Sequence, residues 1–143
     1  MVFGKIFEFQ HRWLNEILEE NNLSAEGLFD ANVHRYSIDQ GAIPVSIGAL
    51  TQEGNVAMLR TVANRGRVKN KGMGKLLVWH ILAEAQWKKL TSVYLLTDTA
   101  ENFFTKLGFE KIKRSELPAK FENNNLVKKA CSKNSVVMKI DVA

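Results

Sequence analysis

The segment that most restricts the fold of this chain is VKNKGMGKLL, residues 68 to 77. It places Gly72 and Gly74 one residue apart among three lysines, directly before apolar residues of helical spacing. A helix N-terminus presents unpaired N–H groups and a partial positive charge, and glycines let an anion approach those groups closely. The segment therefore predicts a basic anion cradle at the start of a long helix, from about Gly72 to Lys88.

Other uses of a glycine turn fit this segment less well. A solvated turn before a helix would contain similar residues, because a short glycine motif is weak evidence by itself. A P-loop fails because Gly74-Lys75 lacks the required spacing and the following Ser or Thr. A dinucleotide-binding Rossmann turn is disfavoured because the preceding strands are predicted to form a meander and the Gly-x-Gly-x-x-Gly fingerprint is absent.

Composition predicts a single globular domain, residues 1–143, with 45% hydrophobic and 24% charged residues. The sequence shows neither an apolar run long enough to cross a bilayer nor a signal-peptide pattern, so we expect a cytoplasmic protein that does not bind membranes. The single cysteine, Cys131, excludes an internal disulfide, and without Cys/His clusters we expect no metal. The net charge of +5 favours an anionic partner, and the charge by itself does not distinguish nucleic acid, an acidic membrane and a phosphorylated cofactor.

Strand and helix signals alternate along the chain. Before the glycine turn we predict a strand at 2–7, a helix at 8–22, a short helix at about 24–32, and strands at 34–39, 42–50 and 55–63. After the long helix we predict a strand at 92–96, a helix at 99–107, a strand at 109–114, a helix or ordered excursion at 118–134, and a strand at 135–142. Thr99 is the expected N-cap of the 99–107 helix and Gly108 its stop. This order indicates an antiparallel meander followed by a crossover.

Two motifs in this order resemble the GNAT superfamily of acyl-CoA-dependent N-acetyltransferases. KNKGMG, Lys69 to Gly74, is similar to its Arg/Gln-x-x-Gly-x-Gly/Ala turn, and AENFFTKLGF, Ala100 to Phe109, is similar to its second signature. LLTDTAENFFTKLGF, Arg114-Ser115 and CSKNSVVM also resemble the group of these enzymes named for arsenic resistance. The resemblance implies an α/β (α+β) fold with a mixed, mainly antiparallel central sheet flanked by helices and a splayed V between strands 4 and 5.

The resemblance also implies acetyl-CoA as cosubstrate. Its pantetheine would bind the backbone of Val62, Ala63 and Asn64, with a backbone N–H of Val62 or Ala63 as the oxyanion donor. Its phosphates would bind the turn, and the second motif would contribute further contacts. The predicted cofactor-binding residues outside strand 4 are Lys69, Asn70, Lys71, Gly72, Met73, Gly74, Lys75, Thr97, Phe103, Phe104 and Lys106.

The usual catalytic groups of the superfamily are missing from this sequence. Phe103-Phe104 replaces a pair whose second member is often the tyrosine that protonates the thiolate. The strand at 55–63 contains no carboxylate to act as base, and Glu53 lies in the preceding turn. The catalytic residues are therefore unknown. Alignment of amine and thioester, with water removing the proton, would support direct transfer, and we interpret Cys131 as a structural thiol.

Arg60 is the one charged side chain in the predicted strand at 55–63. An unpaired buried charge is costly, so Arg60 should face solvent or a polar cleft. On the implied fold it lies near the acceptor site, where its planar guanidinium would suit a carboxylate; an internal ion pair is the alternative. Thr97 and Thr99 are further substrate-binding candidates.

The predicted function is transfer of acetyl from acetyl-CoA directly to the amine of a small amino-acid-like metabolite or toxic analogue, including an arsenic-containing one. The alternative is a catalytically silent acyl-CoA-binding or regulatory module, which the missing tyrosine and carboxylate favour. Nucleic-acid binding is not expected, because lysines and aromatic residues are scattered along the sequence. The sequence is compatible with a homodimer.

Overall fold

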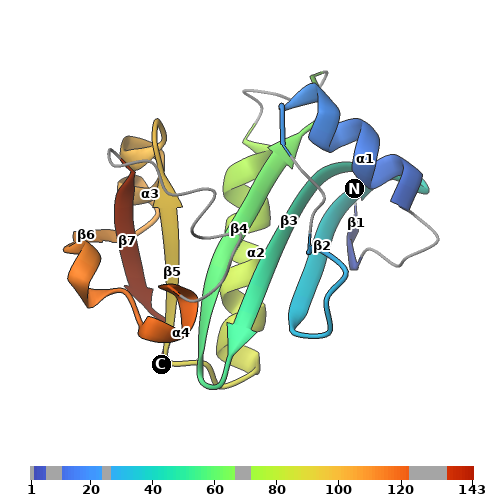
Figure 1. Cartoon of the computed structure of the whole chain (residues 1–143). Coiled ribbons are helices and arrows are strands. Elements are labelled where there is room, and N and C mark those ends of the chain that lie inside the picture. The colour runs from blue at the N-terminus through green and yellow to red at the C-terminus, as the bar shows by residue number, and fades with distance from the viewer. Residues whose placement is uncertain (1, 6–10, 24–26, 67–71, 123–134) are drawn as a thin grey trace.

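The computed structural model describes residues 2–5, 11–23, 27–66, 72–122 and 135–143. Within these residues the strands form one mixed sheet of order β1-β2-β3-β4-β5-β7-β6 (Figure 1). The strands are β1 Val2–Lys5, β2 Val33–Gln40, β3 Ile43–Glu53, β4 Val56–Asn64, β5 Ser92–Thr97, β6 Glu110–Ile112 and β7 Val136–Asp141. The helices are α1 His11–Glu20, α2 Met73–Trp87, α3 Glu101–Lys106, α4 Ala119–Glu122 and the short 3₁₀ helix η3 Arg114–Glu116.

The sheet splits at its centre, between β4 and β5. All other neighbouring strands pair antiparallel, whereas β4 and β5 run parallel because the α2 crossover joins them. Their register covers only Val56–Ser92, Ala57–Val93 and Met58–Tyr94, after which the two strands separate. Figure 1 shows them diverging toward their C-terminal ends, with α2 beginning at the open end. The predicted mixed sheet with a V between the fourth and fifth strands is confirmed.

Two local predictions are wrong. The described part of the predicted 24–32 helix, residues 27–32, forms turns, because Gly27 adopts a left-handed φ of 75°. Thr99 does not cap α3: Ala100 is the N-cap, and the hydroxyl of Thr97 accepts a hydrogen bond from its backbone N–H at 2.9 Å. The remaining predicted strands and helices that lie in described segments are present, with ends shifted by a few residues.

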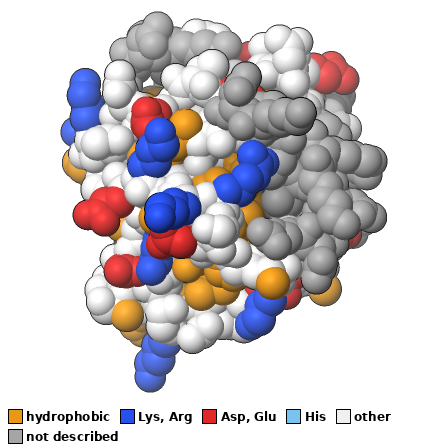
Figure 2. All heavy atoms as spheres, turned by 60° about the vertical axis from the view of Figure 1, so that its left-hand side comes forward, with side chains coloured by type: hydrophobic (Ala, Val, Ile, Leu, Met, Phe, Trp, Pro, Cys, Tyr) orange, Lys and Arg blue, Asp and Glu red, His pale blue; other side chains and the backbone are white. Residues whose placement is uncertain are grey.

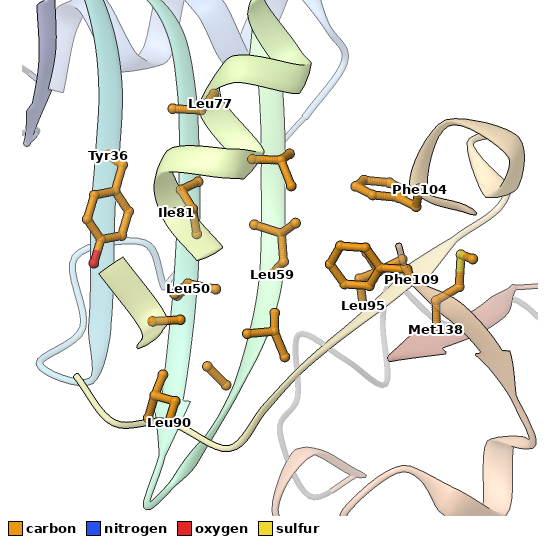
Figure 3. Close-up of a cluster of buried hydrophobic side chains, with 14 of the residues drawn as sticks. Tyr36, Leu50, Leu59, Leu77, Ile81, Leu90, Leu95, Phe104, Phe109 and Met138 are labelled. Atoms are coloured by element: carbon orange, nitrogen blue, oxygen red, sulfur yellow. The ribbon is translucent and has the colours of Figure 1, made fainter. Parts of the chain in front are cut away.

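Helix α2 covers one face of the sheet over β2, β3 and β4. Leu77, Val78 and Ile81 are fully buried there, and Figure 3 shows Leu77 and Ile81 directed at the strands. Gly48 on β3 permits this close approach, since a Cβ at that position would lie 2.7 Å from Ile81 Cδ1. The same core extends beyond β4 to Leu95, which lies beside Phe104, Phe109 and Met138 in Figure 3.

The opposite face of the sheet carries α1 and α4. On α1, the buried side chains of Leu14, Ile17 and Leu18 form a separate apolar cluster with residues of β3 and β4. On α4, the ring of Phe121 packs against that of Tyr94, with the ring centroids 6.1 Å apart. In the part of the chain that the structure describes, no helix combines the length and apolar character needed to cross a membrane. Helices on both faces thus hold the two halves of the split sheet in place.

Candidate active site at the split in the sheet

The N-terminus of α2 lies at the open end of the V. Gly72 is its N-cap, with a left-handed φ of 79°, and no side chain of a described residue caps it. The first intrahelical bond runs from the Leu76 N–H to the Gly72 carbonyl at 3.2 Å. The N–H groups of Met73, Gly74 and Lys75 therefore have no acceptor within the helix, as is general for a first turn. These donors and the helix dipole favour an anion at this point.

Gly74 is buried where three elements meet. A Cβ on Gly74 would lie 3.5 Å from Asn64 Nδ2 and 3.8 Å from Val62 Cγ1, both on β4, and 3.6 Å from Phe103 Cζ on α3. The structure thus brings together residues that are about 40 positions apart in the sequence, all of them predicted cofactor contacts. These distances are ordinary van der Waals contacts, so a methyl group would fit at this position without strain.

The free edge of β4 presents selected backbone groups. The Arg65 N–H donates to the Val45 carbonyl at 2.8 Å, and hydrogen-bonded and non-hydrogen-bonded pairs alternate along an antiparallel ladder. Ala63 therefore directs its backbone groups at β3, whereas Val62 and Asn64 direct theirs at the side from which β5 has departed. Of the two predicted oxyanion donors, Val62 is the one whose N–H faces the split.

Side-chain contacts hold this edge in position. The hydroxyl of Ser46 donates to Asn64 Oδ1 at 2.6 Å, and Asn21 Nδ2 donates to the Asn64 carbonyl at 3.0 Å. Arg65 pairs with Glu16 of α1 at 3.4 Å. These contacts tie the end of β4 to β3 and α1, away from β5. The sequence analysis does not identify Ser46, Asn21 and Arg65 as residues that position the site. The polar pair Asn64-Arg65 at the end of β4 was the one signal in the sequence that pointed to such contacts.

The two phenylalanines of the second motif have different environments. Phe103 is 37% exposed and reaches Gly74, whereas Phe104 is only 8% exposed. Phe104 packs edge-to-face against Phe109, with ring centroids 5.5 Å apart, and belongs to the core that Figure 3 shows around Leu95. The structure therefore places Phe103 beside the helix start and Phe104 in the core. Neither ring carries a hydroxyl that could donate a proton.

Arg60 occupies a β-bulge. The β3–β4 register shifts between Ala49 and Leu50, and Arg60 is the extra residue on β4. Leu59 and Val62 both pack into the core under α2, so the two residues between them share the opposite face of the sheet. Bulges redirect side chains, and this one turns Arg60 to the face that carries α1 and α4. Arg60 is half-buried there and has an interaction partner.

The remaining predicted contacts that the structure describes lie at the end of β5, on α3 and on α2. Thr97 ends β5, and its hydroxyl is engaged at the start of α3, while Thr99 is exposed in the turn between them. Lys106 is exposed at the last residue of α3. The Lys75 ammonium lies 4.6 Å from the centre of the Trp79 ring, one turn further along α2. Lys69, Asn70 and Lys71 lie outside the described residues.

The described ionisable groups with clearly shifted pKa values lie away from the open end. Burial, with a smaller contribution from Glu84, raises the pKa of Tyr36 to about 12. The hydrogen bond from Ser92 to Asp141, at 2.8 Å, and that from Lys139 lower the pKa of Asp141. Ser92 pairs with Val56, where β4 and β5 are still joined. No group of three or more His, Cys, Asp or Glu among the described residues could hold a metal ion.

Comparisons with known proteins identify the fold. No protein-family model matches the sequence, and neither does any curated protein. Among solved structures, a GNAT-family acetyltransferase from Staphylococcus aureus is 16% identical, with a TM-score of 0.76 and 99% of each chain covered. The ribosomal-protein-S18-alanine N-acetyltransferase from Escherichia coli is 12% identical, with a TM-score of 0.77, and the match covers 99% of this chain and 94% of that one.

A third neighbour was solved with coenzyme A. N-acetylglutamate synthase from Neisseria gonorrhoeae, in complex with coenzyme A and N-acetyl-glutamate, is 16% identical, with a TM-score of 0.80, and the match covers 99% of this chain and 35% of that chain. The chain therefore has the fold of GNAT acetyltransferases. The names of these neighbours mention a ribosomal protein and glutamate, so a shared fold does not determine the acceptor.

Proposed function

We propose that this protein is an N-acetyltransferase that uses acetyl-CoA. The observation that carries the proposal is the arrangement around Gly74, where unpaired helix N–H groups, the free backbone edge of β4 and the exposed ring of Phe103 border one site. The helix start suits the pyrophosphate of coenzyme A, and the β4 edge suits the amides of pantetheine, which would pair with it as an added strand.

The chain's contribution to the reaction would be mainly positional. The thioester supplies an activated acetyl group, which a neutral amine attacks as the new N–C bond forms and the C–S bond breaks. The Val62 N–H at the open edge would stabilise negative charge on the carbonyl oxygen. Solvent would take the proton from the amine and return one to the thiolate, because neither phenylalanine can do so. Alignment of the two reactants can supply a large part of the acceleration.

We infer that the acceptor is the amine of a small amino-acid-like molecule. The sequence resemblance to the arsenic-resistance group supports a toxic amino-acid analogue, including one that contains arsenic. Arg60, Thr97 and Thr99 are the acceptor contacts proposed from the sequence. A cytoplasmic location is part of the same proposal.

A silent acyl-CoA-binding module is the second candidate. Its support is the pair Phe103-Phe104, which brings no hydroxyl to the site, together with a β4 strand that lacks a carboxylate. A screen of amines that follows free CoA, run beside thermal melts with acetyl-CoA, separates the two functions. We expect stabilisation by acetyl-CoA and release of CoA with at least one amino-acid-like amine. Stabilisation without turnover on any amine would favour the silent module.

A further inference from the structure

An open groove of about 710 Å³ lies at the end of the β6–β7 ladder. Its walls come from β6, η3 and the start of β7, and we call it the β6–β7 groove. The volume is within the range of small-molecule sites. Apolar side chains of both strands contribute to the lining beside polar ones, as is usual for a site that holds an organic ligand. No function has been assigned above to any residue that lines it.

The β6–β7 groove is predominantly cationic. Among the described residues, the lining carries three positive charges and one negative charge, from Lys111, Lys113, Arg114 and Glu116. Glu116, the last residue of η3, accepts a hydrogen bond from the backbone N–H of the N-cap residue Lys113 at 3.1 Å, which holds its carboxylate at the start of this short helix. Figure 2, in which the left-hand side of Figure 1 comes forward, shows basic side chains next to exposed hydrophobic surface on this side of the molecule. Such a lining suits an oxyanion attached to an organic group.

A hydrogen bond links the groove to the open end of the V. Ser135, which lines the groove, donates to Asp98 Oδ1 at 2.6 Å. Asp98 directly follows β5, and the first residue of β7, Val136, pairs with the last residue of β5, Thr97. This is the end at which β5 has separated from β4. The cationic groove therefore adjoins a carboxylate at the end of β5 that borders the open end of the V.

We propose that the β6–β7 groove binds the acceptor as a zwitterion, with its oxyanion beside Lys113 and Arg114 and its ammonium group toward Asp98. This inference rests on the proposed acetyltransferase function and assigns the acceptor's negative group to the groove in place of Arg60. Arg60 is half-buried at the bulge on β4, which is the opposite arm of the V. A cationic groove beside a carboxylate is complementary to a zwitterion, and its excess of positive charge favours acceptors that carry an oxyanion over amines that lack one.

Kinetics with paired acceptors test the assignment. For the amine that turns over in the screen and its carboxamide counterpart, Lys113→Met should raise the KM of the charged acceptor about tenfold and leave that of the amide unchanged. Asp98→Asn keeps a side-chain oxygen that can accept the hydrogen bond from the Ser135 hydroxyl but removes the negative charge. It should therefore raise the KM of the charged amine and that of its amide to a similar extent. Lys120→Met, which removes one exposed charge on α4 outside the groove, is the matched control and should change neither value. Acetyl-CoA affinity should be the same in all variants.

A binding measurement tests the groove without turnover. In NMR titrations of the CoA-bound protein with standard L-amino acids, we expect shifts of the Lys113 and Asp98 amide signals, their loss in Lys113→Met and their retention in Lys120→Met. Shifts that centre on Arg60, shifts nowhere, or a KM effect in Arg60→Met but not in Lys113→Met would overturn the inference. Shifts in the groove without CoA release from any amine would support the groove and contradict the acetyltransferase function instead.

Discussion

Replacement of Gly74 by alanine should change stability and cofactor affinity in opposite directions. Gly74 lies in the first turn of α2, and a Cβ there would meet its nearest atoms at 3.5–3.8 Å, which is ordinary contact. Alanine should therefore fit without strain, and its higher helix propensity should stabilise the fold by about 0.5–1 kcal/mol. The same methyl group would cover the N–H groups that the phosphates of acetyl-CoA must approach.

The expected loss of affinity follows from one charge-assisted hydrogen bond. Such a contact contributes about 1.5–3 kcal/mol, which corresponds to a roughly 10- to 150-fold increase in the Kd of acetyl-CoA. Isothermal titration calorimetry measures the Kd, and urea unfolding of the free protein measures stability. Gly66→Ala is the matched control, because a Cβ at Gly66 has no neighbour within 4 Å. Unchanged affinity in a Gly74→Ala protein that is at least as stable as the wild type would refute the placement of the phosphates at this helix.

Three further variants test how the scaffold positions the site. Gly48→Ala should destabilise the fold by about 1–3 kcal/mol in urea unfolding, because its Cβ would lie 2.7 Å from Ile81 Cδ1; an unchanged midpoint would mean that α2 does not pack this closely. Ser46→Ala should cost about 1–2 kcal/mol by the same assay, because it removes the 2.6 Å hydrogen bond to Asn64, and should weaken acetyl-CoA binding only modestly. For Tyr36 the raised pKa means that the folded state keeps a proton that the unfolded chain loses, so stability should fall as the pH rises from 10.0 to about 12. Tyr36→Phe should remove that fall, which is about 3 kcal/mol at its full extent, and parallel stability curves for both proteins across this range would contradict it.

The sequence predicts well what depends on periodicity and on glycine. The α2 helix begins within one residue of its predicted start because Gly72 adopts a left-handed φ, and Gly108, with φ of 104°, ends the α3 segment as expected. The same chemistry explains the failure at 24–32, where Gly27 interrupts the apolar spacing. The prediction of the V between β4 and β5 came from the resemblance to a known family, because nothing in the residue pattern of either strand indicates where their pairing stops.

Contacts between distant side chains were outside the reach of sequence reasoning. Asn64 is held by Ser46 and Asn21, 18 and 43 residues away, and a residue pattern does not specify such pairings. The burial of Phe104 and the exposure of Phe103 likewise depend on the packing of α3 against the core that contains Leu95 and Phe109. The resemblance to a known family implies that Arg60 lies near the acceptor site, and the register shift that determines its face becomes visible only when β3 and β4 are paired.

The most direct test of the central claim is an acetyl-CoA reaction with a panel of amino acids and their amides, in which free CoA and the acetylated product are both quantified. We predict equal amounts of CoA and N-acetylated product from at least one amino-acid-like amine, with the rate at limiting acetyl-CoA strongly reduced in Gly74→Ala. Acetyl-CoA binding without any acetylated product, or product formation that Gly74→Ala leaves unchanged, would contradict acetyl transfer at the split in the sheet.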